Sequence, residues 1–253
     1  MSQPLETSRS GRVLQLRLNR PEKRNALNAE LCLALVRAIT EADADPSVGA
    51  ILLTANGPSF CAGMDVSEIQ ARNNADINLA HEQLFTIGTR IVTPLVGAIG
   101  GAALGGGVGL VANCHIAVAS ARAAFGLTEI RLGLWPFLVF RAMVAAVGER
   151  RALEMSLTGR TFAAVEAKAI GLVHEVAEDA DEQALALAEG IAAASPTAIL
   201  NGLAFVREAR GRSWQQAGEI ARRVRNEMFE SADFREGLAA FREKRSPKWP
   251  SLT

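Results

Sequence analysis

The stretch Pro94-Leu-Val-Gly-Ala-Ile-Gly-Gly-Ala-Ala-Leu-Gly-Gly-Gly-Val-Gly-Leu-Val-Ala-Asn-Cys-His-Ile-Ala-Val-Ala-Ser120 decides the fold. Almost every residue in it is apolar or small, which is typical of elements that are covered on all sides. The pattern predicts a buried strand, a glycine-lined turn, a short apolar helix and a second buried strand. Gly105 to Gly107 stand where the helix begins, so its free N–H groups either face an incoming oxyanion or only allow close packing.

Two common nucleotide-binding motifs do not match this stretch. A dinucleotide fingerprint needs glycines at offsets 0, 2 and 5, and no frame supplies them. A P-loop needs Gly-Lys-Ser/Thr after its glycines, whereas Gly107 is followed by Val108 and Gly109. What remains is a helix N-terminus suited to a smaller oxyanion.

Composition sets the class of protein. Of the 253 residues, 49% are hydrophobic, enough for the core of one large domain or of one domain with a helical appendage. Lysine plus arginine and aspartate plus glutamate both number 27, and the formal net charge of zero argues against nucleic acid as a partner. The first residues lack the apolar run of a signal peptide, and no membrane partner is expected.

The cysteines and histidines are few and scattered along the chain. Cys32, Cys61 and Cys114 are odd in number and lack the spacing of a metal site. We therefore expect reduced thiols, a cytoplasmic protein and no bound metal. The three histidines are expected to be surface or core residues rather than ligands: His81, His115 and His174.

Strands and helices alternate in the first part of the chain. Strands are expected over residues 12–18 and 49–55, with a helix between them that Asn28 caps. The polar loop over residues 19–25 holds three cations within five residues. It is either a solvated turn or a contact for an anionic group such as a phosphate.

A second turn of small residues covers positions 59–66, after a strand end and before a helical segment. Its backbone N–H groups are also able to face a ligand, and Asp65 is expected to cap the helix that follows. An amphipathic helix over residues 78–92 is expected to lead into the glycine-rich stretch.

Glu129 is a carboxylate among apolar neighbours, with Leu127, Ile130 and Leu132 close in sequence. Such surroundings raise the pKa of a carboxyl group and suit it to carry a proton. The alternative is a structural ion pair with Arg131 or Arg141.

The last third of the chain is predicted to be helical, with helices over residues 150–157 and 163–170 and another that starts at Ser195-Pro196. The final helix, after Ser231, has a stripe of apolar residues at i, i+4 and i+7. We expect this one-faced helix to dock against the core or a neighbouring subunit. Strands and helices followed by helices alone predict an α/β core with a helical extension.

Three stretches together resemble the crotonase superfamily, which contains the enoyl-CoA hydratase/isomerase family. They are Leu18-Asn-Arg-Pro-Glu-Lys-Arg-Asn-Ala-Leu-Asn28, Phe60-Cys-Ala-Gly-Met-Asp65 and Gly101-Ala-Ala-Leu-Gly-Gly-Gly107. Segments near Leu157-Thr-Gly-Arg160, Glu166 to Val173 and Asp233 to Arg245 extend the match in the right order. The resemblance implies an α/β fold, a spiral of ββα units over residues 1–190. It also implies a helical trimerisation region over residues 191–253, giving a homotrimer or a dimer of trimers.

The resemblance also assigns roles to residues of this chain. It implies that the backbone N–H groups of Met64 and Gly106 form an oxyanion hole for the carbonyl of an acyl-CoA thioester, with Glu129 as the catalytic carboxylate. Coenzyme A would enter as part of the substrate, with no separate cofactor. The resemblance implies contacts with CoA at Lys23, Arg24, Ala26, Ala62 and Asp65, and, from a neighbouring subunit's last helix, at Phe241 and Lys244.

One departure from the family decides between reactions. Hydratases of the family hold and activate a water with two glutamates, and the position of the first is Gly109 in this chain. The second aligns with Glu129, and the glycine-rich turn that usually follows it is replaced by Leu134-Trp-Pro-Phe-Leu-Val139. The segment from Gly126 to Phe137 is similar to the single-glutamate isomerases of the family.

Three functions are compatible with these residues. The first is a shift of the double bond of a 3-enoyl-CoA to position 2 by Glu129. The second is hydration of a 2-enoyl-CoA, with the missing carboxylate supplied by Asp65 or Glu68. The third is a non-catalytic acyl-CoA-binding protein.

Overall fold

A six-stranded sheet runs through the body of the protein, and a smaller sheet of four short strands lies beside it. The computed structural model describes residues 3–69 and 74–252. The larger sheet has the order β1-β2-β3-β5-β7-β10, with β1 antiparallel to β2 and the other neighbours parallel. Its strands are β1 (Leu5–Ser10), β2 (Val13–Leu18), β3 (Ala50–Ala55), β5 (Leu95–Ile99), β7 (Ile116–Ser120) and β10 (Glu175–Ala177).

The smaller sheet makes the repeat visible. It has the order β4-β6-β8-β9, with β4 (Ser59–Cys61), β6 (Ala102–Leu104), β8 (Ala124–Gly126) and β9 (Phe162–Ala163). Each of the strands β3, β5 and β7 is followed by a short strand of this sheet and then by a helix. This succession of ββα units is the spiral that the resemblance implies.

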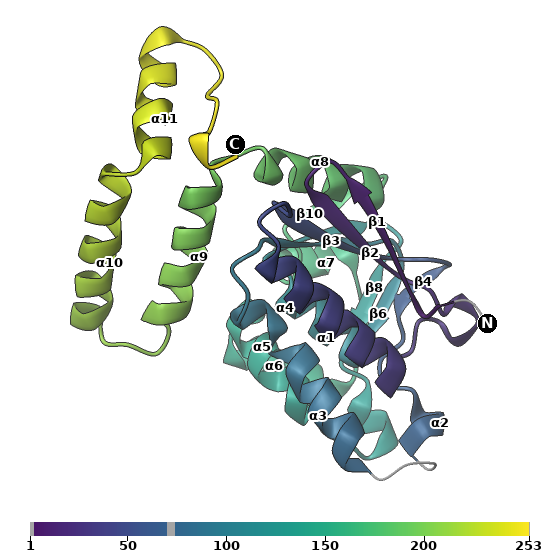
Figure 1. Ribbon diagram of the computed structural model, residues 1–253. Coiled ribbons are helices and arrows are strands. Elements are labelled where there is room, and N and C mark those ends of the chain that lie inside the picture. Colours follow the sequence, from purple (N-terminus) through teal and green to yellow (C-terminus); the bar gives the residue numbers. More distant parts are fainter. Residues whose placement is uncertain (1–2, 70–73, 253) are drawn as a thin grey trace.

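Within the described residues, eight α-helices belong to the body. Figure 1 shows how they surround the sheets. They are α1 (Ala29–Ala44), α2 (Val66–Ile69), α3 (Asn74–Phe85), α4 (Gly106–Asn113), α5 (Phe137–Val147), α6 (Glu149–Thr158), α7 (Ala164–Ala169) and α8 (Ala180–Ala192). The side chain of Asn28 caps α1 by accepting a hydrogen bond from the N–H of Leu31, as the sequence predicts. The expected strands over residues 12–18 and 49–55 are confirmed as β2 and β3.

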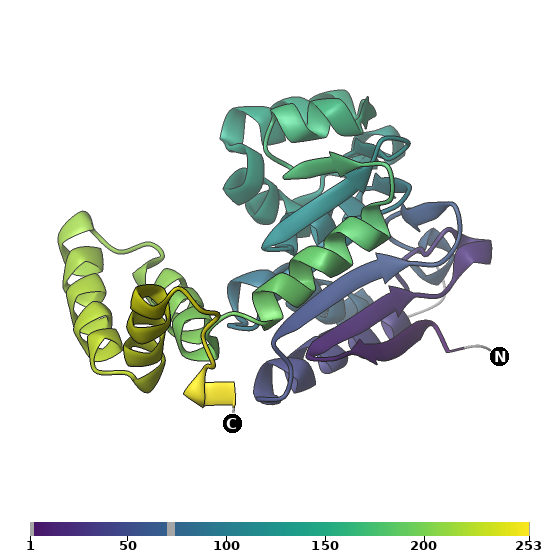
Figure 2. The same cartoon turned by 90° about the horizontal axis from the view of Figure 1, so that it is seen from above.

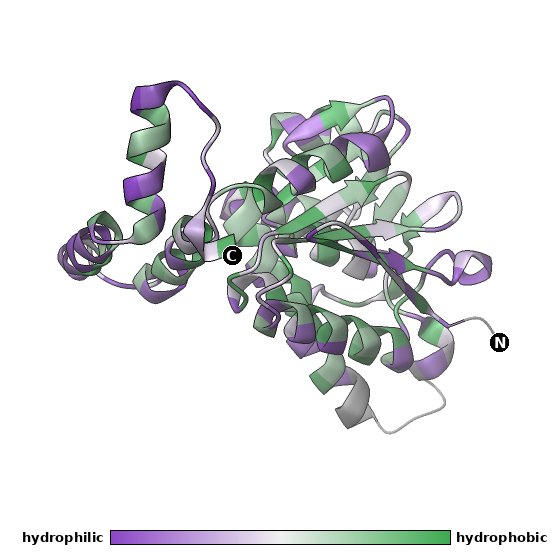
Figure 3. Cartoon of the chain, turned by 45° about the horizontal axis from the view of Figure 1, so that its top comes forward, coloured by the Kyte–Doolittle hydropathy of each residue, from purple (hydrophilic) through white to green (hydrophobic). Residues whose placement is uncertain are grey.

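The two faces of the larger sheet are covered by different kinds of residue. One face packs on leucine, isoleucine and phenylalanine side chains in the main core, including those of α1, α3 and α4. The other face is covered by α8, whose buried stripe consists of alanines: Ala180, Ala184, Ala188 and Ala192. Figure 3 shows hydrophobic residues along the strands of the body.

The helix expected over residues 78–92 is shorter at its end than predicted. The helix α3 stops at Phe85, and a 3-10 turn follows over Ile87–Thr89. The side chain of Asn113 causes the stop, because its amide donates to the carbonyl of Phe85 and accepts from the N–H of Gly88. Backbone also approaches closely here, since a Cβ on Gly88 would lie 2.0 Å from the carbonyl oxygen of Asn113.

Three further helices extend away from the body (Figures 1 and 2). They are α9 (Pro196–Ala209), α10 (Trp214–Phe229) and α11 (Ala232–Glu243). Side chains of Ser195 and Ser231 cap α9 and α11, and Ser213 forms a capping box with Gln216 on α10. Among the helices of residues 3–69 and 74–252, none alone is long and apolar enough to cross a membrane. Only α8 and α9 taken together reach that length, across a bend of 102°.

The three cysteines lie inside the body. Cys32 on α1 and Cys61 on β4 are buried, and half-buried Cys114, at the end of α4, packs its sulfur against Gly97 of β5. Burial raises the pKa of all three thiols, to about 12 for Cys61 and Cys114. They are therefore protonated thiols at neutral pH.

Candidate active site

A cavity of about 720 Å³ opens between the first turn of α4, the helix α3 and the start of α5. Four segments line it: the loop after β4, one face of α3, the first turn of α4, and residues 128–139. These segments bring Met64, Gly106 and Glu129 into one cavity, although they come from three separate parts of the sequence. The predicted catalytic set is therefore assembled in space.

The N–H group of Met64 is left free by the pairing of its neighbours. Leu27 forms an isolated parallel bridge with Met64, in which the N–H of Leu27 donates to the carbonyl of Gly63 and the N–H of Asp65 donates to the carbonyl of Leu27. The N–H of Met64 lies between these two bonds and points to the other side. Within the described part of the chain it has no hydrogen-bond partner.

The second free N–H belongs to Gly106, the first residue of α4. No described residue accepts a hydrogen bond from it, as expected in the first turn of a helix. Gly105 has φ +52° and ψ −119°, a conformation that favours glycine. A Cβ on Gly63 would lie 2.9 Å from the carbonyl of Leu104 and 3.3 Å from the nitrogen of Gly106, so glycine lets the two loops meet.

Glu129 begins a 3-10 turn that ends at Leu132. Its carboxylate lies over the glycine turn, because a Cβ on Gly105 would be 3.1 Å from Oε1. The other oxygen, Oε2, is buried and has no hydrogen-bond partner among the described residues. Burial raises the pKa of Glu129, and its own backbone N–H offsets part of the rise. The alternative pairing with Arg131 or Arg141 does not occur, since the described residues place no cation in an ion pair with Glu129.

A family model described as enoyl-CoA hydratase/isomerase matches residues 8–251. The chain belongs to this family. A putative enoyl-CoA hydratase of Thermus thermophilus is 37% identical over 247 residues, which cover 94% of this chain and 98% of the relative. The 2,3-dehydroadipyl-CoA hydratase of Escherichia coli is 35% identical over 247 residues, which cover 96% and 97%.

Solved structures of this enoyl-CoA hydratase/isomerase family share the architecture. The crystal structure of an enoyl-CoA hydratase of Mycobacterium smegmatis has a TM-score of 0.92 at 31% identity and covers 97% of this chain and 98% of that one. A human enoyl-CoA hydratase domain-containing protein has a TM-score of 0.92 at 27% identity, with 97% and 100% covered. The fold is that of the crotonase superfamily.

Gly109, which the resemblance aligns with the first glutamate of the family's hydratases, faces packed side chains. A Cβ there would lie 2.1 Å from Cγ1 of Val139 and 2.9 Å from Cδ1 of Phe85. A side chain at this position would require the side chains of Val139 and Phe85 to shift. The missing carboxylate is thus replaced by an apolar wall made of Val139 and Phe85.

The two acids considered as substitutes are already engaged and do not line the cavity. Oδ2 of Asp65 accepts a hydrogen bond from Arg20 at 3.0 Å, and Oδ1 accepts from Ser67. Burial alone would raise the pKa of Asp65, but the hydrogen bonds from Ser67 and Arg20 together lower it. Oε2 of Glu68 accepts from the N–H of Ala29 at the start of α1. The bond from the N–H of Ser67 agrees with the predicted capping of α2 by Asp65.

The polar loop before α1 lies beside the cavity. Arg24 and Asn25 adopt left-handed conformations, and the side chain of Asn25 donates to the carbonyls of Asn56 and Ser59. The carbonyl of Arg24 accepts from the N–H of Ala62, which lines the cavity. The charged groups of Lys23 and Arg24 are exposed, and neither forms an ion pair within residues 3–69 and 74–252. The half-buried Ala26 closes the loop.

Phe241 and Lys244 lie elsewhere, on and just after α11 (Figure 1). They do not line the cavity of their own chain. Phe241 is 82% exposed, and Lys244 ends the helix in a left-handed conformation. Their assignment to the CoA of a neighbouring subunit stays a prediction.

His81 of α3, expected from the sequence as a surface or core residue, lines the cavity. It is 3% exposed, its ring stacks on Phe85 with 5.8 Å between centroids, and its Nε2 has no partner among the described residues. Burial lowers the pKa of His81, so the ring is neutral at pH 7. The spacing of Ala80, His81, Leu84 and Phe85 along one helix face was a usable signal that this histidine faces inward.

Proposed function

We propose that this protein moves the double bond of a 3-enoyl-CoA from position 3 to position 2. The carboxylate of Glu129 takes a proton from C2, and the charge that develops on the thioester oxygen is held by the N–H groups of Met64 and Gly106. The C2–C3 double bond forms as the electrons of the C3–C4 bond take the same proton from Glu129 at C4. Glu129 ends as a carboxylate again, so protons and electrons balance.

The observation that carries this proposal is the wall at Gly109. A shift of the double bond needs one group that accepts and returns a proton, whereas hydration also needs a second group to hold the water. Val139 and Phe85 fill the place from which the second glutamate would act. A carboxyl group with a raised pKa also exchanges protons with a weak carbon acid more readily than an ordinary one.

Hydration of a 2-enoyl-CoA is the second candidate, because the relatives named above are described as hydratases. Asp65 and Glu68 are poor candidates for its second acid, since both are engaged outside the cavity. Among the described lining residues the other carboxylate is that of Glu82, on α3. A hydratase of this kind would depend on Glu82 or on the ring of His81 to hold the water.

The deciding experiment follows the purified protein with a 3-enoyl-CoA and a 2-enoyl-CoA in parallel, in deuterated water. Conversion of the first without water addition to the second supports the proposal, and Glu129→Gln should abolish it. Glu82→Gln is the matched control and should leave the shift within about threefold, because Glu82 carries no proton in this mechanism. Hydration that Glu82→Gln abolishes would favour the second candidate. Tight binding with no deuterium at C2 would favour a non-catalytic acyl-CoA-binding protein.

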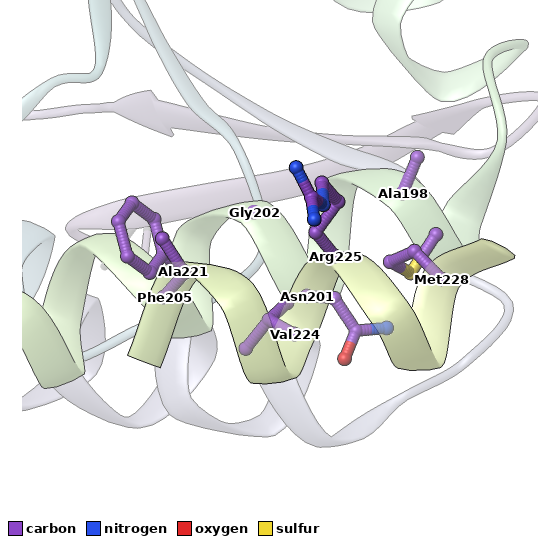
Figure 4. A pocket seen from close by; sticks show the side chains of 8 residues that line it. All are labelled: Ala198, Asn201, Gly202, Phe205, Ala221, Val224, Arg225 and Met228. Atoms are coloured by element: carbon purple, nitrogen blue, oxygen red, sulfur yellow. The ribbon is translucent and has the colours of Figure 1, made fainter. Parts of the chain in front are cut away.

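We also propose that copies of this chain assemble, as a homotrimer or a dimer of trimers, through the helices that extend from the body. In one chain, α9 and α10 bury none of their side chains, and a groove of about 380 Å³ runs between them (Figure 4). Phe205, Val224 and Met228 give the groove an apolar lining. Light scattering tests the assembly: Val224→Asp should lower the mass, whereas Asn226→Asp, an exposed residue of α10 outside the groove, should not.

A further inference from the structure

The cavity has an apolar end whose side chains are exposed to solvent. Six large apolar residues line this end and are each 39–72% exposed. They belong to three segments that are distant in sequence: α2, α3, and the stretch from the 3-10 turn to the start of α5. The residues are Val66, Leu79, Leu132, Leu134, Phe137 and Leu138. Exposed apolar side chains gathered at one opening mark a surface that a ligand or partner covers.

Local hydrogen bonds and ring packing hold this surface in place. Gly133 ends the 3-10 turn in a left-handed conformation, and the N–H of Leu134 donates to the carbonyl of Glu129 at 3.1 Å. The N–H of Phe137 donates to the carbonyl of Trp135, and the Trp135 ring packs on Phe140 with 5.8 Å between centroids. Phe137 is therefore 72% exposed on the first turn of an ordered helix, not on a loose loop.

The same cavity connects this surface to the reacting groups. Glu129 and the free N–H groups of Met64 and Gly106 line the same cavity as the apolar end, which includes Leu132, three residues after Glu129. A thioester placed with its oxygen on the two N–H groups must send its acyl chain along the remaining space. A four-carbon acyl group ends at the carbon that receives the proton, so it would leave the apolar end uncovered.

We propose, on the basis of the function proposed above, that the substrates are acyl-CoAs with medium-length or long apolar acyl chains. The tail of the chain passes Leu134 and crosses the opening, where Leu132 and Phe137 cover it. The volume of the cavity, about 720 Å³, suits such a substrate, since ligand pockets span roughly 300–1,000 Å³. The stretch that replaces the family's glycine-rich turn after Glu129 would thus determine which acyl-chain lengths bind.

Binding of saturated acyl-CoAs tests this proposal without relying on catalysis. Calorimetry with butanoyl-, octanoyl- and dodecanoyl-CoA should show affinity that rises about fourfold for each CH₂ group that the cavity buries. Leu132→Ser and Phe137→Ser should each lower the affinity for dodecanoyl-CoA about tenfold and the affinity for butanoyl-CoA less than about twofold. Leu33→Ser is the matched control, because Leu33 is exposed on α1 and lies outside the cavity. It should change neither affinity.

Three results would overturn the proposal. The first is equal affinity for the three acyl-CoAs, and the second is an equal loss of affinity for all three in the Leu132→Ser and Phe137→Ser variants. The third is a change in the mass of the assembly in these variants with no change in acyl-CoA affinity. The last result would assign the apolar end to contact with another copy. The proposed function can fail separately. If affinity rises with the length of the acyl chain but the protein shifts no double bond, the proposed reaction is wrong and the proposed acyl-chain preference stands. The absence of binding by any acyl-CoA would overturn both.

Discussion

The side chain of Val139 occupies the space that a side chain at Gly109 would need: a Cβ at position 109 would lie 2.1 Å from Cγ1 of Val139. The helices α4 and α5 can approach this closely only because position 109 has no side chain. The glycine that the resemblance places where the family's hydratases have a glutamate is therefore also required by the packing of α4 on α5. A glutamate at position 109 would have to displace the side chains of Val139 and Phe85.

Gly109→Ala should lower the free energy of unfolding by about 1–3 kcal/mol, because the added methyl group overlaps Val139 and Phe85. Val139→Ala in the same chain makes room for that methyl group. The double variant should therefore lose less unfolding free energy than the sum of the losses in the two single variants. Denaturation in urea measures all three. Gly190→Ala on α8 is the control: nothing lies within 4 Å of its Cβ position, and the change should stabilise by roughly 0.5–1 kcal/mol. Additive losses at positions 109 and 139 would show that the two side chains do not compete for space.

Glu129→Gln should raise the melting temperature at pH 7 while it removes activity. The ionised carboxylate is half-buried and its Oε2 lacks a partner. A neutral amide at this position should therefore raise the free energy of unfolding by roughly 1 kcal/mol and the melting temperature by about 2–4 °C. Loss of the base should lower kcat by about 10²–10⁴-fold. Differential scanning calorimetry is the measurement, with the exposed Glu41→Gln on α1 as its control. A lower melting temperature in Glu129→Gln would mean that the carboxylate stabilises the site.

The pH dependence of activity and that of stability should run in opposite directions at Glu129. The base acts when it is ionised, so kcat/KM should fall as the pH drops through its pKa, which lies above the ordinary value of 4.5. A raised pKa means that the folded protein holds this proton more tightly. The stability from this group is thus complete below pH 4.5 and is lost as the pH rises through the folded-state pKa. A pH series of kcat/KM and of the difference in melting temperature between the wild type and Glu129→Gln tests both. An acid limb at or below the ordinary value would contradict the raised pKa.

Asp65→Asn should destabilise the protein far more than the same substitution in an exposed ion pair. The Arg20–Asp65 pair, at 3.0 Å, is nearly buried, so removal of the charge should cost about 3 kcal/mol. The matched control is Asp45→Asn in the exposed Arg9–Asp45 pair, which should cost much less because solvent screens the two charges. Because the pKa of Asp65 is lowered on folding, this stability is present above its ordinary value of 3.8 and is lost as the pH falls through the folded-state pKa. Denaturant titrations at pH 7 and pH 3 measure it, and equal losses for both variants would contradict the expected effect of burial.

The sequence predicts those elements whose signals are local. The strands β5 and β7 and the helix α4 follow from one continuous apolar stretch, and the caps Asn28 and Ser195 stand at the residues expected. The strand β1 was not predicted, because only Leu5 of its six residues is buried and its pattern is that of a polar edge. The helix α8 was missed because its buried stripe is made of alanines, which contrast little with their neighbours.

The candidate site shows the same division. Met64, Gly106 and Glu129 were predicted from motifs, and the cavity brings them together. The inward position of His81 follows from the helical spacing of Ala80, His81, Leu84 and Phe85, all of which are buried. The contact between Gly109 and Val139, however, depends on how α4 and α5 cross. Such contacts between helices leave no local pattern in the sequence. The apolar residues at the exposed end of the cavity likewise cannot be distinguished from core residues in the sequence. Only the fold shows that they lie at an opening.

The protonated, shielded thiols of Cys32, Cys61 and Cys114 make the native protein slow to react with alkylating reagents. The buried thiols of Cys32 and Cys61 become reactive only when the element around each of them opens, whereas half-buried Cys114 serves as the comparison. The modification rates at Cys32 and Cys61, read by mass spectrometry, therefore report how often α1 and β4 separate from the core. Cys61 lies three residues before Met64, so its labelling measures the motion of the loop after β4 without any introduced probe.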